Sequence, residues 1–187
     1  MEKPYDGRAT IQKDGDSLEI SIPTAKPVFD IIFLMAWLGG WYFGETAALD
    51  QVFSDTTEAE NSWFLIFWLV GWTIGGVFFI LIFLWLIGGK EIVSIDSGEM
   101  IIGREIFGVG HYKTYNINDI KYLTLNPRLD KDQWGQARDR YLVRSGLIEF
   151  DYGLRTIKFG SGIDMAEARH LIKILKENQN FKEANFR

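Results

Sequence analysis

The 187-residue sequence has no cysteine and two histidines, and these shortages exclude several kinds of chemistry. Without cysteine, the chain cannot form disulfides, thiolate metal sites or cysteine nucleophiles. His111 and His170 lack the neighbouring ligands of a zinc motif. The glycine turns at 108–110 and 160–162 lack the other residues of a dinucleotide-binding motif or a P-loop. The sequence therefore predicts no catalytic residues, no metal and no cofactor, which is typical of a protein that is not an enzyme.

Basic residues are also missing from a long part of the chain. Residues 28–89 contain six acidic residues and no Lys or Arg, and the whole chain has a net charge of −5. No part is basic enough to predict a nucleic-acid partner. Within this part, residues 63–89 carry no charge at all. A helix of this length spans about 40 Å, which exceeds the roughly 30 Å hydrocarbon core of a bilayer. We therefore predict a transmembrane helix here.

A second, less regular apolar segment precedes that helix. Residues 28–49 carry only the charges of Asp30 and Glu45, which lie near the two ends. Charges near helix ends can reach the membrane interface, so this segment predicts a second transmembrane helix. The alternative is a re-entrant or interfacial segment. The two helices would form a hairpin over residues 28–89, with an acidic outer loop at 45–62.

The basic residues that flank the hairpin predict its orientation. Lys26 precedes the first helix and Lys90 follows the second, whereas the 45–62 loop contains only acidic charges. Because cytoplasmic loops are enriched in Lys and Arg, we expect both termini in the cytoplasm. Residues 1–27 and 90–187 would then lie on the same side of the membrane and could pack together.

Each predicted helix contains two glycines four positions apart. The pairs are Gly40 with Gly44, and Gly71 with Gly75. Glycines at this spacing share one helix face and let another backbone approach closely. One interpretation is that the two pairs pack against each other within the hairpin. The alternative is that one pair faces another subunit.

The segments outside the hairpin have the pattern of β-strands. Residues 8–12 and 18–22 flank a turn, which predicts an N-terminal β-hairpin. After Lys90, short runs of alternating apolar and polar residues are separated by turn residues. We expect Ile120, Tyr122 and Thr124 to share one face of their strand. The strands predicted in this part are 91–95, 99–106, 111–115, 120–125, 140–143, 147–152 and 154–159.

The chain is predicted to close with an amphipathic helix. Asp164 is placed to cap its first turn, together with Glu167 three positions later. An apolar stripe follows at the spacing of one helix face. Its members are Ala168, Leu171, Ile172 and Leu175.

Two hydrophobic helices followed by short strands and a terminal helix resemble the bacterial membrane-anchored pleckstrin-homology-like (PH-like) domain family. The resemblance lies in the segments Glu91-Ile-Val-Ser-Ile-Asp, Glu99-Met-Ile-Ile-Gly, Tyr115-Asn-Ile-Asn-Asp-Ile-Lys-Tyr, Thr156-Ile-Lys-Phe-Gly and Ala166-Glu-Ala. It covers roughly residues 90–178. It implies an all-β, partly open barrel with a C-terminal capping helix, in a multi-pass protein of the bacterial inner membrane.

One basic group is the candidate binding site. It consists of Arg138, Arg140, Tyr141 and Arg144. Arginines here could meet acidic lipid headgroups or the carboxylates of a partner protein. Asp130, Asp132 and Asp139 lie among them, so a solvated loop with local ion pairs is the alternative.

The absence of catalytic patterns and the family resemblance lead to one favoured function. We expect a non-enzymatic inner-membrane protein whose cytoplasmic PH-like domain binds a partner protein or self-associates. One alternative is an accessory subunit, whose hairpin packs on a larger integral membrane complex. Another is sensing of anionic membrane lipid by the PH-like domain.

Overall fold

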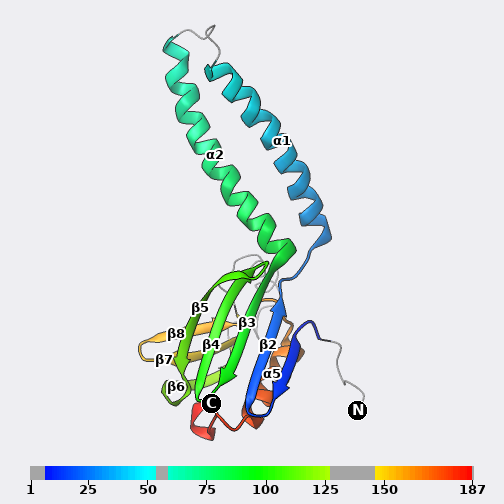
Figure 1. Cartoon of the computed structure of the whole chain (residues 1–187), viewed down its shortest axis with the longest axis vertical. Helices are drawn as coiled ribbons and strands as arrows, with labels where there is room; N and C mark the ends of the chain where they lie inside the picture. The colour runs from blue at the N-terminus through cyan, green and yellow to red at the C-terminus, as the bar shows by residue number, and fades with distance from the viewer. Residues whose placement is uncertain (1–6, 54–58, 127–145, 187) are drawn as a thin grey trace. The chain divides into compact units, whose positions relative to one another are not determined.

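The structure is a computed structural model that describes residues 7–53, 59–126 and 146–186, with residues 59–62 described by their backbone only (Figure 1). The chain divides into two compact units. The helical unit comprises Lys26–Ile87, and the β unit combines residues 1–25 with residues 88–187. Each unit is described by itself.

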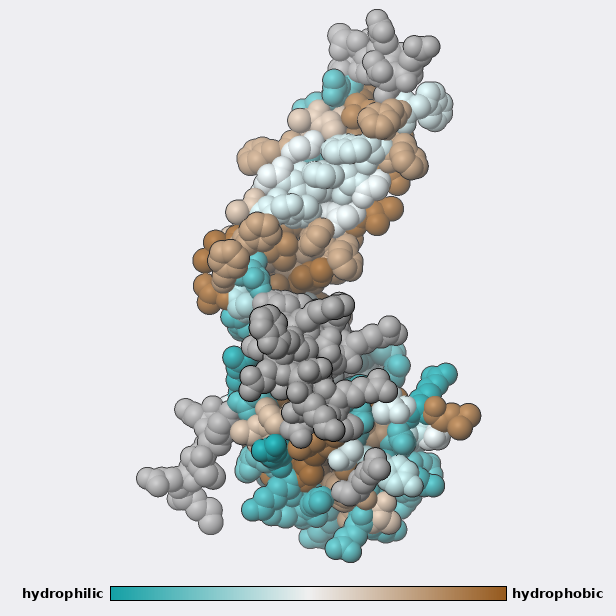
Figure 2. Space-filling view, turned by 180° about the vertical axis from the view of Figure 1, so that it is seen from behind, coloured by the Kyte–Doolittle hydropathy of each residue, from teal (hydrophilic) through white to brown (hydrophobic). Residues whose placement is uncertain are grey.

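The helical unit is a pair of long helices, α1 (Val28–Phe53) and α2 (Ala59–Gly88). Both are long and apolar enough to cross a membrane, α2 through Trp63–Gly88. Figure 2 shows mostly brown and pale side chains over these helices, in contrast to the mostly teal β unit. Both helices extend into the loop expected at 45–62, because α1 continues to Phe53 and α2 begins at Ala59. Residues 54–58 of that loop lie outside the described residues.

The first sheet of the β unit is antiparallel, with the strand order β1-β2-β3-β4-β5. Its apolar residues alternate with polar ones, as expected for a sheet with one buried face. One row of that face runs across three strands through Ile20, Val93 and Ile102. The strands are β1 (Thr10–Asp14), β2 (Ser17–Pro23), β3 (Gly89–Asp96), β4 (Glu99–Ile106) and β5 (Val109–Asn116).

The N-terminal hairpin belongs to this same sheet. Strand β2 pairs with β3 from Leu18 opposite Ile95 to Pro23 opposite Lys90. The predicted segment 1–27 is therefore no separate region of structure, because β1 and β2 extend the sheet of the C-terminal part. The expectation that the two segments pack together is confirmed.

The second sheet has three antiparallel strands, β6 (Ile120–Leu125), β7 (Ile148–Tyr152) and β8 (Arg155–Phe159). The face predicted for β6 is wrong, because a β-bulge interrupts its alternation between Lys121 and Thr124. Tyr122 has a positive φ of 55° and is exposed, while Ile120 and Leu123 are both buried. A bulge of this kind places two residues of one strand against one of its neighbour and shifts the alternation.

Helix α5 (Met165–Glu177) begins as the sequence predicts. The carboxylate of Asp164 accepts a hydrogen bond from the backbone N–H of Glu167 at 2.9 Å. The Glu167 carboxylate accepts from the N–H of Ala9 at 2.5 Å, which ties the helix to the N-terminal segment. Ala168, Leu171 and Leu175 of the predicted stripe are fully buried, and Ile172 is partly buried against the core.

The core of the β unit lies between the two sheets and α5. The ring of Tyr115 on β5 packs edge-on against Phe150 and Tyr152 of β7. The corner between the sheets is formed by a short 3-10 helix (Ile117–Asp119). In the described part of the chain, the sheets are not closed into a barrel, since β5 pairs only with β4, and β8 only with β7. The strand predicted at 140–143 lies outside the described residues.

Candidate cleft between the two sheets

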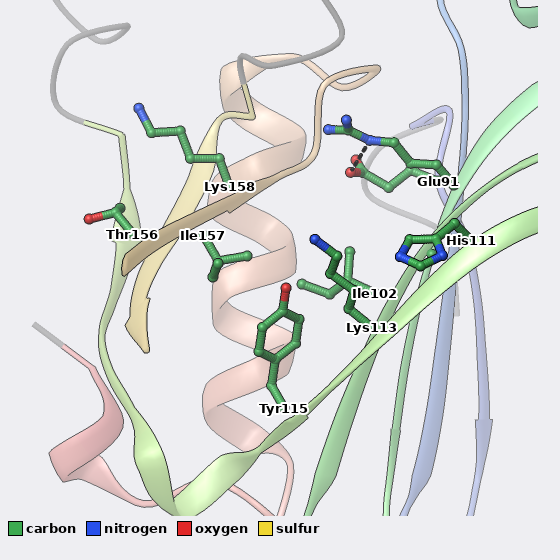
Figure 3. Close-up of a pocket in the computed structure, with 10 residues that line it drawn as sticks. Glu91, Ile102, His111, Lys113, Tyr115, Thr156, Ile157 and Lys158 are labelled. Atoms are coloured by element: carbon green, nitrogen blue, oxygen red, sulfur yellow. Dashed lines mark hydrogen bonds and ion pairs between the residues drawn. The ribbon is translucent and has the colours of Figure 1, made fainter. Parts of the chain in front are cut away.

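A cleft of about 610 Å³ opens in the β unit where the two sheets fail to close (Figure 3). This volume lies within the range of about 300–1,000 Å³ that is usual for ligand sites. The wall from β3, β4 and β5 faces the wall from β8. The lining residues are Glu91, Ile102, Gly103, Arg104, His111, Lys113, Tyr115, Thr156, Ile157 and Lys158.

The alternation of strand β5 places three chemically different side chains on the cleft side. His111, Lys113 and Tyr115 are two positions apart, so they share one face of the strand. His111 lies opposite Arg104 on β4, and Lys113 lies opposite Ile102. The cleft therefore has a polar end at Arg104 and His111, with the ammonium group of Lys113 between this end and the apolar interior.

The interior of the cleft is apolar. Figure 3 shows Ile157 of β8 pointing toward Ile102 and Tyr115, with α5 behind them. Tyr115 is buried, and this burial, followed by the effect of Tyr152, raises the pKa of its phenol. The Tyr115 ring is therefore neutral at physiological pH and contributes an apolar wall with a polar tip.

The rim of the cleft at β8 is already paired. Lys158 Nζ lies 3.4 Å from Glu149 Oε2, and the Thr156 hydroxyl lies 2.7 Å from the Asp151 carboxylate. In Figure 3 the side chains of Thr156 and Lys158 point away from Ile157, toward the outside. These residues shape the edge of the cleft but add little uncompensated charge to it.

Glu91 fastens the two walls to each other. Its side chain is 2% exposed, and Oε2 accepts hydrogen bonds from the backbone N–H groups of Gly160 at 2.7 Å and Ser161 at 3.2 Å. Its other oxygen lies 3.4 Å from Arg104 Nε (dashed in Figure 3). Because Gly160 and Ser161 directly follow β8, Glu91 on β3 fixes the end of β8 against the first sheet.

The charge left in the cleft is positive. Glu91 is the only acidic residue among the described residues that line the cleft, and Arg104 and two backbone N–H groups engage its carboxylate. Lys113 has no carboxylate partner within the described residues, and neither has His111. The arrangement can bind a carboxylate or another anion beside an apolar surface. In the described ranges, no cluster of three or more His, Cys, Asp or Glu residues could hold a metal ion.

A second polar cluster supports the cleft from the outer face of the sheet. Lys90 Nζ lies 2.7 Å from Glu105 Oε1, and the Tyr112 hydroxyl donates to Glu105 Oε2. The hydrogen bond from Lys90, followed by that from Tyr112, lowers the pKa of Glu105. The Glu105 carboxylate raises the pKa of Tyr112 in turn. The Tyr112 ring also covers Gly103, where any side chain would collide with it. These contacts hold β5 against β4 and β3.

The helical unit contains a polar contact that the sequence did not predict. Glu45, expected at the start of the outer loop, is 9% exposed within α1. The Thr73 hydroxyl lies 2.5 Å from Glu45 Oε1 and also 2.8 Å from the carbonyl of Leu69. The other Glu45 oxygen has no hydrogen-bond partner among the described residues. The spacing in the sequence could have indicated this contact. Glu45 follows Trp41 by one helical turn, so the two residues share one face of the helix.

The predicted packing of the two glycine pairs within the hairpin is wrong. A side chain built on Gly40, Gly44, Gly71 or Gly75 would meet no atom within 4 Å. The close approach occurs at Gly76, where any side chain would overlap the ring of Trp41. Trp41 Nε1 also donates to the carbonyl of Trp72 at 3.2 Å. The alternative, that a glycine pair faces another subunit, stays a prediction.

The cleft is not the binding site that the sequence predicted. Arg138, Arg140, Tyr141 and Arg144 lie outside the described residues, so that site stays a prediction. The sequence did contain a signal for the cleft, because His111, Lys113 and Tyr115 alternate along a single strand. What it could not show was that β8 lies across from them. No family model, curated protein or solved structure matches this chain.

Proposed function

We propose that the protein is a membrane-anchored, non-enzymatic binding protein whose β unit docks a partner protein in the cleft between β5 and β8. The observation that carries this proposal is the position of the cleft. It lies at the open side of the two sheets, with a cationic Lys113 at an apolar wall and no carboxylate partner for it among the described residues. Two sheets with a C-terminal helix also support the proposed PH-like fold, read as a barrel that is open at this cleft.

In this proposal, α1 and α2 cross a bacterial inner membrane with both termini in the cytoplasm. The surfaces of both helices support the crossing, because they expose large apolar side chains such as Phe29, Phe43, Trp63 and Phe67. An apolar surface of this extent marks a membrane or protein contact. The orientation is supported by Lys26 and Lys90, which flank the hairpin on the proposed cytoplasmic side.

The open glycines favour a second role for the hairpin, which is association with another transmembrane helix. Each glycine directly precedes a residue at the contact between the helices, as Gly40 precedes Trp41 and Gly75 precedes Gly76. Because the helices are antiparallel, both glycine pairs then lie on the same side of the hairpin. A second copy of this chain or a subunit of a larger membrane complex fits that side.

Site-specific photocrosslinking in cells tests the docking proposal on the full chain. A photoreactive amino acid at position 113 would lie in the cleft, and one at position 13 would lie on β1, at the opposite edge of the sheet. We expect a protein adduct from position 113 and none from position 13, and an adduct of twice the chain's mass would indicate self-association. A lipid adduct at position 113, or equal protein adducts at both positions, would contradict docking in the cleft.

A further inference from the structure

Both strands that border the cleft are sheet edges. In the described part of the chain, β5 pairs only with β4, and β8 pairs only with β7. Each strand therefore turns one row of backbone N–H and C=O groups toward no other strand among the described residues. Strand β5 is also exposed from Val109 to Thr114. An exposed edge of this kind is a template on which another extended segment can add as a strand.

We propose that the cleft binds an extended acidic segment of a partner protein, which pairs antiparallel with β5 and fills the gap in front of β8. This inference rests on the proposed function and names the ligand class of the same site. Antiparallel pairing is the arrangement of all the paired strands in both sheets. It is also slightly more stable per residue than parallel pairing.

The side chains of β5 predict which residues the segment carries. Residues directly opposite on paired strands interact, and alternate residues share one face. Carboxylates would therefore lie opposite His111 and Lys113, and an apolar side chain opposite Tyr115. Because the segment is antiparallel to β5, its N-terminal residue in this pattern lies opposite Tyr115. From the N-terminus, the expected order is therefore an apolar residue, any residue, an acidic residue, any residue and a second acidic residue. The apolar residue would also meet Ile157, which points into the cleft.

Charge complementarity favours an acidic segment. Arg104 lies opposite His111 and one step diagonally from Lys113, so a carboxylate placed between them meets two cationic side chains and an imidazole. Glu91 already has Arg104 Nε and two backbone N–H groups as partners, and it is almost completely buried. It therefore offers little repulsion to an incoming carboxylate.

The apolar wall and the two edges favour a peptide over a lipid headgroup or a free anion. A headgroup or an inorganic anion would use the charges of the cleft only. A peptide would use these charges, cover Ile102 and Ile157, and form main-chain hydrogen bonds with β5. The anchoring of β8 by Glu91 holds the gap open before binding, which reduces the ordering cost of association.

The inference can be tested with the purified full chain in detergent micelles. The probe is a fluorescent form of the peptide acetyl-Thr-Ile-Thr-Glu-Thr-Glu-Thr-amide, and its binding is followed by anisotropy. We expect binding at least about tenfold tighter than that of the same peptide with both Glu replaced by Lys. Lys113→Glu should reverse this preference, while Lys13→Glu on β1 should leave it unchanged. Equal binding of both peptides would overturn the inference.

Backbone methylation separates strand addition from simple charge attraction. Two further peptides are N-methylated at alternate residues. One carries the methyl groups on the odd-numbered amides and the other on the even-numbered amides. We expect at least one of them to lose binding, because the amides of that set face β5. Hydrogen exchange at β5 amides should also slow when the unmodified peptide is bound. If both methylated peptides bind as well as the parent, or β5 exchange is unchanged, the segment does not add as a strand.

Competition identifies other ligands and separates the two proposals. Unlabelled acidic peptide should displace the probe, whereas inorganic phosphate and vesicles containing anionic lipid should not. Displacement by vesicles or phosphate at similar charge concentration would overturn the inference in favour of an anion site. If position 113 crosslinks a partner protein but the acidic peptide does not bind, the ligand class is wrong and the docking function stands. If both experiments fail, both proposals fall.

Discussion

The two units of the molecule treat a buried carboxylate in opposite ways. In the β unit, Glu91 has three hydrogen-bonding or charged partners, from β4 and from the turn after β8. In the helical unit, Glu45 has one hydroxyl as its partner, and its second oxygen has none in the described ranges. The β unit therefore uses buried charge to fix strands that are distant in sequence. In the hairpin, the ring of Trp37 on α1 packs against the rings of Trp72 and Phe79 on α2.

This difference follows from the backbone of each unit. Strand edges and turns contain backbone N–H groups that have no partner within their own element. A glutamate beside them can therefore accept several hydrogen bonds. Helices use nearly all their N–H groups internally, so a glutamate between two helices finds only side-chain donors. The contrast predicts that removing a carboxylate strongly weakens the β unit and only slightly weakens the hairpin.

The largest expected effect is that of Glu91→Ala. This substitution leaves the N–H groups of Gly160 and Ser161 without their acceptor and Arg104 without its acid. We expect the free energy of unfolding of the β unit to fall by about 3 kcal/mol. The measurement is denaturant unfolding of the full chain in micelles, followed by the near-ultraviolet signal of Tyr115 and its neighbours.

Glu149→Ala is the matched control for Glu91→Ala. Glu149 pairs with Lys158 at 3.4 Å on the partly exposed rim, and such pairs contribute at most about 1 kcal/mol. Equal losses in the two variants would show that Glu91 is no more than another surface acid. The contrast between the two units would then be lost.

The second effect concerns aromatic packing in the hairpin. Gly76→Ala places a methyl group into the ring of Trp41, so the helices must shift, at a cost of about 1–3 kcal/mol. Gly75→Ala meets no atom within 4 Å and should leave the hairpin unchanged. Thermal unfolding of the helices in micelles, followed by circular dichroism and Trp fluorescence, distinguishes them. A larger loss in Gly75→Ala would place the helix contact one residue earlier than the structure does.

These two variants also show what the sequence can and cannot predict. The spacing of Gly71 and Gly75 places both on one helix face, and a side chain built at either position would meet no atom within 4 Å. The spacing does not show that Trp41 packs on Gly76, because this contact depends on how both helices are rotated about their axes. Glu45 was misread for a similar reason. A charge in an apolar run indicates a helix end unless its partner, here Thr73 on the other helix, is known.

In the β unit, local patterns predicted most strands, the turns and the start of α5. They failed where distant segments decide the outcome. The pairing of β2 with β3 bridges the whole hairpin, and no local pattern encodes it. The bulge at Tyr122 shifts the face of β6, because the core requires both Ile120 and Leu123. The cleft likewise depends on the position of β8 across from β5, and these strands belong to different sheets.

The third effect is the coupling between Glu45 and Thr73. A double-mutant cycle of Glu45→Gln and Thr73→Val should give a coupling of about 1 kcal/mol, as is usual for hydrogen bonds between membrane helices. Thermal unfolding of the helices in micelles measures each variant. A coupling near 3 kcal/mol would make the hairpin as dependent on its carboxylate as the β unit and would break the comparison. The control is the same cycle with Thr46→Val in place of Thr73→Val, because the Thr46 hydroxyl bonds only to carbonyls within α1.

The smallest effect is the pH dependence of the β unit. Hydrogen bonds from Lys90 and Tyr112 lower the pKa of Glu105 below the ordinary value of 4.5 for a glutamate side chain. The stability gained from this carboxylate is therefore present above that value and lost as the pH falls through the lower pKa of the folded state. Tyr112, with its pKa raised above 10.0, contributes stability below that pH which is lost as the pH rises through the higher folded value.

Two variants isolate these contributions. Glu105→Gln should flatten the fall in stability between neutral and acid pH, and Tyr112→Phe should reduce the fall above pH 10.0. Part of the alkaline fall should remain in Tyr112→Phe, because burial also raises the pKa of Tyr115. Unfolding free energies measured across the pH range test both. Wild-type slopes in Glu105→Gln would mean that Lys90 and Tyr112 do not stabilise this carboxylate, and β5 would then be held against β4 by its backbone pairing alone.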